Sequence, residues 1–339
     1  MSATVTSPRG LRARGAGLSS TAIVYLVLLG AIVIGAILTA TAGRNFFSSG
    51  NISAILTATS ILGLVAIGQT LVILVGSLDL SVPYVVSLSS LVGGTMMAGQ
   101  TGNIVPAVLV TVGVAAAIGL ANGLIVSQLH VHGFIATLGV GLIVSGYLGT
   151  NYKGSAGSAP GAFRAIDETK IGPVPVSVLI MVAFAALAIL LLQRTRIGHH
   201  MYAVGGSPEV ARLSGLRTSP PVVVAHVLCS VMSALAGLLL LSRLSVGSPT
   251  IGSQGGYDLL SIAAVVLGGT LLAGGRGGIL GTLGGVAIFA VMDSTMGALQ
   301  VNPFLKDVVR GVIIIAAVAV YARRNLQVRP ARFSAQEAR

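Results

Sequence analysis

Few residues in this sequence have the types and spacing that catalysis or metal binding requires. His130 and His132 are two residues apart, a spacing that suits metal ligands, but no cysteine or carboxylate cluster accompanies them. The apolar stretches carry no serine–histidine pairing and no His-Glu-x-x-His motif, which argues against an intramembrane hydrolase. Gly274–Gly278 lacks the Lys-Ser/Thr of a phosphate-binding loop and the acidic residue of a dinucleotide site. The sequence therefore predicts no catalytic residue, no metal site and no cofactor in this chain.

Asp79 is an isolated carboxylate in the joint between two apolar stretches, Gly76–Ser81. A charged side chain within hydrocarbon costs at least ~2.5 kcal/mol, so Asp79 should face protein, water or a helix end. Ser81 and the free N–H groups of a following helix could bind this carboxylate in a cap. Two roles stay open for Asp79 and Ser81: structural capping, which we favour, and contact with a transported solute.

Asp307 and Arg310 lie three residues apart at the start of the last apolar stretch, so they share a helix face and favour a local ion pair. A proton or ion relay would need further acidic residues nearby, and only Asp293 is available. This scarcity weakens the hypothesis of an ion-coupled secondary transporter, which remains the alternative from another functional class.

The composition indicates that these residues are positioned by membrane-spanning helices. Charged residues make up only 8% of the 339 residues, hydrophobic residues make up 54%, and there are 46 glycines. Mean hydropathy is +0.95. Long apolar stretches with few charges are typical of membrane helices, and glycine suits close helix packing in lipid. The single cysteine, Cys229, excludes an internal disulfide and is expected to be a small packing residue.

We predict an all-α polytopic membrane protein with about ten transmembrane helices, because ten stretches have the length that a bilayer requires. The expected transmembrane permease domain is 20–322, between tails 1–19 and 323–339. The expected spans are 20–42, 52–75, 82–99, 104–127, 134–150, 174–193, 220–242, 258–273, 279–298 and 305–322.

The distribution of basic residues predicts the orientation. If the N-terminus is cytoplasmic, thirteen Lys and Arg residues lie on the inside and five on the outside. The positive-inside rule selects this arrangement, with both termini cytoplasmic and the disordered tails on that side. Because the basic residues cluster in loops and tails, the net charge of +12 indicates orientation in lipid and not nucleic-acid binding. The longest outer loop, 151–173, is expected to be irregular or to form a short surface helix.

The longest cytoplasmic interruption, the loop at 194–219, contains a short punctuated helix. Ser207 suits the N-cap and Pro208 the first helical position, while Glu209 complements the helix dipole and Gly215 suits a left-handed stop. Val210, Leu213 and Leu216 are three apart, which predicts one apolar side. Such a short helix needs a surface to dock on, either a partner protein or the lipid headgroups.

Several motifs resemble ribose-type ABC importer permeases, in the branched-chain amino acid/ribose permease superfamily of binding-protein-dependent transport systems. Gly205–Leu216 resembles the family's cytoplasmic coupling loop. Gly76–Ser81 resembles its Gly-Gly-Ile-Asp-Leu-Ser signature, with Ser77 in place of a glycine, and Gly274–Gly277 resembles its Gly-Gly-Arg-Gly loop. Phe134–Gly139 also matches, although the family usually has Pro-Pro at 132–133. The resemblance covers roughly residues 50–320.

This resemblance implies a permease subunit of the bacterial cytoplasmic membrane, without ATP hydrolysis of its own. Its implied partners are a cytoplasmic ABC ATPase, a periplasmic or lipid-anchored sugar-binding protein, and a second permease copy. The implied cargo is a monosaccharide; a branched-chain amino acid or a nucleoside is the alternative within the family. Arg276 is implied as an inner-loop anchor. The residues implied to contact the ATPase are Ser207, Pro208, Glu209, Val210, Ala211, Arg212, Leu213 and Gly215.

A short internal echo suggests that the domain consists of two inverted five-helix halves. Residues 92–99 and 267–274 match at five of eight positions and fall in the third and eighth expected spans. In an inverted repeat these spans would occupy equivalent positions with opposite directions. Small residues are so frequent in this chain that we give the echo little weight.

Overall fold

The computed structural model describes residues 19–326. Most of the two predicted tails, 1–19 and 323–339, therefore lies outside the described residues. Within the described part the chain is almost entirely helical. The long helices are α1 (Ser20–Thr41), α2 (Ser49–Leu74), α3 (Val82–Met97), α4 (Ile104–Gln128), α5 (Gly133–Asn151), α7 (Val176–Arg194), α10 (Ser219–Leu244), α13 (Ile279–Ala298) and α14 (Pro303–Leu326).

The short elements lie between these long helices. They are η1 (Thr101–Asn103), α6 (Gly161–Glu168), β1 (Lys170–Ile171), β2 (Val174–Pro175), α8 (Arg196–Gly206), α9 (Pro208–Leu213), α11 (Ile251–Gln254) and α12 (Tyr257–Leu267). Strands β1 and β2 form an antiparallel pair. The loop expected at 151–173 thus contains the short helix α6, and it also contributes a strand that the sequence did not indicate.

Seven of the described helices are long and apolar enough to cross a membrane: α1, α2, α4 with η1, α5, α7, α10 and α13. Helices α3 and α12 are apolar but shorter. The chain is therefore an all-α polytopic membrane protein, as the composition predicts. Within the eighth expected span, 258–273, the helix α12 ends at Leu267, and residues 268–278 form a glycine-rich loop. The apolar content of this loop made it resemble helix.

Helices α2 and α10 form the centre of the bundle, and α10 packs against α2, α3 and α4. Glycines allow this close packing. A Cβ atom at Gly119 of α4 would lie 2.6 Å from the His226 carbonyl oxygen, and one at Gly123 would lie 2.6 Å from Cα of Val223. Glycines four residues apart on one helix face let two backbones approach in lipid, where apolar burial drives little association.

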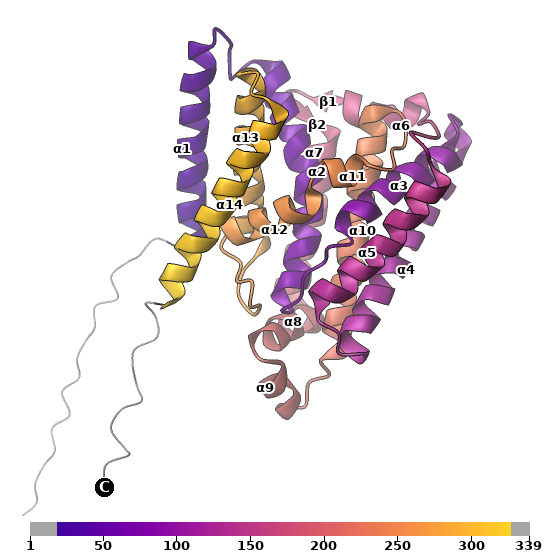
Figure 1. Ribbon diagram of the computed structural model, residues 1–339, viewed down its shortest axis with the longest axis vertical. Coiled ribbons are helices and arrows are strands. Elements are labelled where there is room, and N and C mark those ends of the chain that lie inside the picture. The colour runs from indigo at the N-terminus through magenta and orange to yellow at the C-terminus, as the bar shows by residue number, and fades with distance from the viewer. Residues whose placement is uncertain (1–18, 327–339) are drawn as a thin grey trace, which may run out of the picture.

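Figure 1 shows α8, α9 and the 268–278 loop at one end of the bundle, and α6 with the β1–β2 pair at the other. We call these the α9 end and the α6 end. The first turn of α1 and the last turn of α14 both lie at the α9 end. The two segments of the internal echo differ in conformation: residues 92–97 are helical, whereas 268–274 follow the end of α12.

Candidate functional site

The helix α9 projects from the bundle at the α9 end and has the punctuation that the sequence predicts (Figure 1). The Ser207 hydroxyl accepts a hydrogen bond from the Val210 N–H at 3.3 Å, and Pro208 occupies the first position. Gly215 has φ +79°, and the Leu216 N–H donates to the Ala211 carbonyl oxygen at 3.0 Å, which closes the helix end. The stub is therefore held at both ends by local hydrogen bonds.

The exposed side of α9 is apolar. Leu213 is 83% exposed and Val210 is 60% exposed, whereas Ala211 is buried in the main core. Leu216 is only half-exposed and packs against that core, so the predicted stripe of three is wrong at this position. The left-handed turn at Gly215 redirects the chain and places Leu216 inward. The outward side consists of Val210 and Leu213, flanked by exposed Glu209 and Arg212.

Helix α8 precedes α9, and the sequence analysis missed it. The Thr195 hydroxyl accepts from the Gly198 N–H at 3.2 Å and caps the helix, while Met201 and Val204 are buried. Two sequence features could have predicted α8: a threonine at the N-cap and apolar residues three to four apart. The apolar stretch before Gln193 and the adjacent His199 and His200 made this helix hard to recognise. Ser207 joins the two helices directly: its N–H donates to the Ala203 carbonyl oxygen of α8 at 3.2 Å, and its hydroxyl caps α9.

The 268–278 loop lies beside α8 at the same end of the molecule. Arg276 is exposed, and its carbonyl oxygen accepts from the Leu271 N–H at 2.9 Å, which closes the turn. The Tyr202 hydroxyl of α8 donates to the Gly277 carbonyl oxygen at 3.0 Å. Burial raises the pKa of the Tyr202 hydroxyl. Arg276 and the exposed face of α9 thus share one end of the bundle.

Asp79 is fully buried in the non-helical linker between α2 and α3. Its Oδ1 accepts from the Ser81 N–H at 2.9 Å and from the Ser81 hydroxyl at 2.5 Å, and the Asn122 amide donates to that hydroxyl at 2.9 Å. The Gln69 carboxamide can pair with the Asp79 backbone, accepting from its N–H at 3.2 Å and donating to its carbonyl oxygen at 3.3 Å. The carboxylate thus lies among protein groups and bonds Ser81, but it bonds none of the N–H groups of the first turn of α3.

Two further side chains fix the same linker. The Thr137 hydroxyl of α5 accepts from the Leu80 N–H at 2.9 Å. The Nδ1 of His226 lies 2.9 Å from the Val222 carbonyl oxygen, and its Nε2 lies 3.2 Å from the Ser77 hydroxyl. Because a carbonyl oxygen can only accept, Nδ1 donates to Val222, which leaves Nε2 to bond the Ser77 hydroxyl. The linker is thus bound to α4, α5 and α10.

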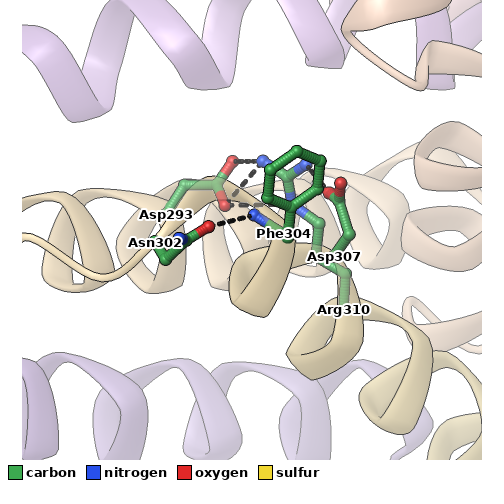
Figure 2. Close-up of polar contacts among 5 residues, drawn as sticks. All are labelled: Asp293, Asn302, Phe304, Asp307 and Arg310. Atoms are coloured by element: carbon green, nitrogen blue, oxygen red, sulfur yellow. Dashed lines mark hydrogen bonds and ion pairs between the residues drawn. The ribbon is translucent and has the colours of Figure 1, made fainter.

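Near the α6 end, Arg310 of α14 links two carboxylates (Figure 2). Its Nη2 donates to both oxygens of Asp293 on α13 at 2.9 and 2.8 Å, and its Nη1 donates to Asp307 at 2.9 Å. The predicted local pair is therefore present, and Asp293 joins it from the neighbouring helix. The Arg310 side chain is 23% exposed, whereas those of Asp293 and Asp307 are 36% and 69% exposed. The three charges satisfy one another, which reduces the cost of placing them on membrane helices.

Comparison of this sequence with known proteins identifies the family of the chain. Residues 51–318 match the model of a family described as "branched-chain amino acid transport system / permease component". The chain belongs to this family. The permease is 36% identical over 305 residues to the ribose import permease protein RbsC of Escherichia coli K12, covering 88% of this chain and 92% of that protein. Identity to RbsC of Bacillus subtilis is 36% over 294 residues, with coverage of 83% and 87%.

A galactose/methyl galactoside import permease protein, MglC of Haemophilus influenzae, is 32% identical to the permease over 325 residues, covering 89% and 95%. No solved structure matches. The predicted resemblance to ribose-type importer permeases is confirmed, and the permease is a transport subunit. The roles of α9, Arg276 and Asp79 within it stay predictions.

Proposed function

We infer that this permease is the membrane-spanning subunit of an ATP-driven importer, and that α9 docks into a groove of a cytoplasmic ATPase. The observation that carries this proposal is the 83% exposure of Leu213 on a helix capped at both ends. A two-turn helix does not hold its shape in water by itself, and local caps with an exposed apolar side suit a pre-formed docking element. Glu209 and Arg212 would form the polar rim of that contact, with Ser207, Pro208 and Gly215 fixing its ends.

The proposed cargo is a monosaccharide delivered by an extracytoplasmic binding protein. The support is that the similar permeases are named for ribose and for galactose or methyl galactoside import. A second permease copy belongs to this proposal because the resemblance to ABC importer permeases implies one. Energy would come from ATP bound by the partner, since this chain has no nucleotide motif.

The proposed topology has ten crossings in the bacterial inner membrane, with the α9 end and both termini cytoplasmic. Seven helices support single crossings, and α14 would form another. Helices α3 and α12 would each complete one together with non-helical chain, 75–81 and 268–278 respectively. Two inverted halves remain part of this proposal. The balance of basic residues supports the orientation.

The test of docking compares two equal charges placed one residue apart. Leu213→Asp should put an unpaired charge in the ATPase groove, at a cost of about 3–5 kcal/mol if the contact is dry. Ser214→Asp adds the same charge at an exposed position beyond the apolar side and serves as the control. We expect Leu213→Asp to insert normally but to lose the co-purified ATPase and uptake, while Ser214→Asp keeps both. Full ATPase retention and uptake in Leu213→Asp would refute the docking role and favour a connector lying at the lipid headgroups.

A further inference from the structure

Three backbone segments that are distant in the sequence lie in direct contact with one another, next to the start of α9. They are the end of α2 at 74–76, the end of α8 at 205–206, and the loop at 274–275. The Gly275 N–H donates to the Leu74 carbonyl oxygen at 3.0 Å. A Cβ atom on Gly205 would collide with that carbonyl group and would lie 2.6 Å from the Gly275 nitrogen. We call this meeting point the glycine joint.

The joint is tight on every side. A Cβ on Gly274 would lie 2.8 Å from the Gly205 carbonyl oxygen and 2.8 Å from the Gly76 nitrogen, and one on Gly275 would lie 2.6 Å from Cα of Gly206. Gly274 and Gly275 also have φ of +88° and +72°, where a side chain would be strained. Backbone atoms cannot rotate aside as side chains do, so a displacement of one segment must move the other two.

The chain between α9 and the joint is short and well packed. Ser207 ends α8 and caps α9 at once, and Ala211, Met201 and Val204 are all buried in the main core. The Tyr202–Gly277 hydrogen bond adds a second tie between α8 and the loop. Buried residues and hydrogen bonds therefore link α9 to α8, and α8 to the joint.

On the far side of the joint, the loop is braced internally and leads into α12 and α13. The Gly278 N–H donates to the Thr270 hydroxyl at 3.3 Å, and the Leu271 N–H donates to the Arg276 carbonyl oxygen. The α2 side leads into the 75–81 linker, which Asn122, Thr137 and His226 hold as described above. The joint thus connects α9 to the ends of two helices and to the linker before α3.

We propose that the glycine joint transmits the movement of the docked α9 into the membrane domain, with Gly205 and Tyr202 as positioning residues for transport. This inference rests on the proposed function, and it concerns what happens after the ATPase has bound. It assigns a role to Gly205, Tyr202 and Gly275 that is separate from docking, because none of them lies on the exposed side of α9.

Adjacent glycines provide a matched test. Gly205→Ala inserts a methyl group into the joint, whereas Gly206→Ala is the control, because a Cβ on Gly206 meets nothing within 4 Å. Each permease variant is purified with its ATPase and reconstituted with the binding protein. We expect Gly205→Ala to retain the ATPase and basal ATP hydrolysis, to lose stimulation of hydrolysis by solute-loaded binding protein, and to reduce uptake by roughly tenfold. Gly206→Ala should behave as the parent protein.

Tyr202→Phe adds no atom to the joint and removes only the hydrogen bond to Gly277. It therefore tests the proposal even if Gly205→Ala fails to insert into the membrane. It should lower uptake per ATP hydrolysed while leaving ATPase retention unchanged. The proposal is overturned if Tyr202→Phe, or an inserted Gly205→Ala, transports like Gly206→Ala. It is also overturned if an inserted Gly205→Ala sheds the ATPase as Leu213→Asp does, since the joint would then only position the docking surface. Failure of the proposed function has a different signature: the parent permease would not retain the ATPase.

Discussion

Substitutions at Asp79 distinguish a structural role of its carboxylate from a role in contacting the transported solute. In Asp79→Ala, the Ser81 N–H and the Ser81 hydroxyl lose their acceptor at a fully buried position. Each buried donor left without a partner costs about 1–3 kcal/mol. The hydroxyl can rotate toward another acceptor but the backbone N–H cannot, so we expect a loss of about 1–3 kcal/mol in the free energy of unfolding.

The matched variant is Asp79→Asn. Its amide oxygen can replace Oδ1 as the acceptor for both Ser81 donors, and Asp79 Oδ2 takes no hydrogen bond from the described residues, so no further bond is lost. The neutral amide also removes a charge from a site that no cationic side chain contacts among the described hydrogen bonds and ion pairs. We therefore expect Asp79→Asn to remain within about 1 kcal/mol of the parent protein.

The measurement is unfolding in mixed detergent micelles, followed by uptake in proteoliposomes for the variants that fold. Capping predicts that Asp79→Ala unfolds at lower denaturant and that Asp79→Asn both folds and transports. A folded Asp79→Asn that binds the ATPase but does not transport would refute the capping account, because it would show that the charge itself acts during passage of the solute.

Two further predictions concern the ion pairs and the topology. Arg310→Gln should leave Asp293 and Asp307 without a counter-charge and destabilise the protein by about 1–3 kcal/mol, which is less than for a fully buried pair because these groups are partly exposed. Adding Asp293→Asn to Arg310→Gln should recover part of that loss. Additive effects of the two substitutions in a double-mutant cycle would contradict the pairing. Cysteines introduced at Ser158 and Ser219 should react with impermeant reagents from opposite sides of the membrane, with Ser158 outside and the buried Cys229 silent; labelling of both from one side would contradict the proposed orientation.

The sequence predicted those features that depend on neighbours along the chain. The cap at Ser207, the proline after it and the stop at Gly215 are local signals, and α9 forms where they place it. The pairing of Asp307 with Arg310 is likewise set by their spacing on one helix. Membrane helices were recognised because a long apolar stretch has few other structural solutions.

Features that depend on distant contacts were missed or misplaced. The glycine joint has no sequence signature, because its three segments are separated by more than sixty residues and meet through backbone atoms. Leu216 has the spacing of an exposed stripe, yet the turn at Gly215 sends it into the core. Hydropathy could not locate the end of α12 at Leu267, since the following loop is apolar and glycine-rich. Part of its backbone is bonded within the loop and to Leu74.

Uptake of a labelled monosaccharide into proteoliposomes tests the central claim most directly. The vesicles would contain this permease with its ATPase, with binding protein on one side and ATP on the other, and the labelled sugar would be ribose or galactose. The account predicts accumulation that requires all three proteins and ATP, and that disappears with Leu213→Asp. Accumulation by the permease alone, driven by an ion gradient and indifferent to ATP, would contradict it.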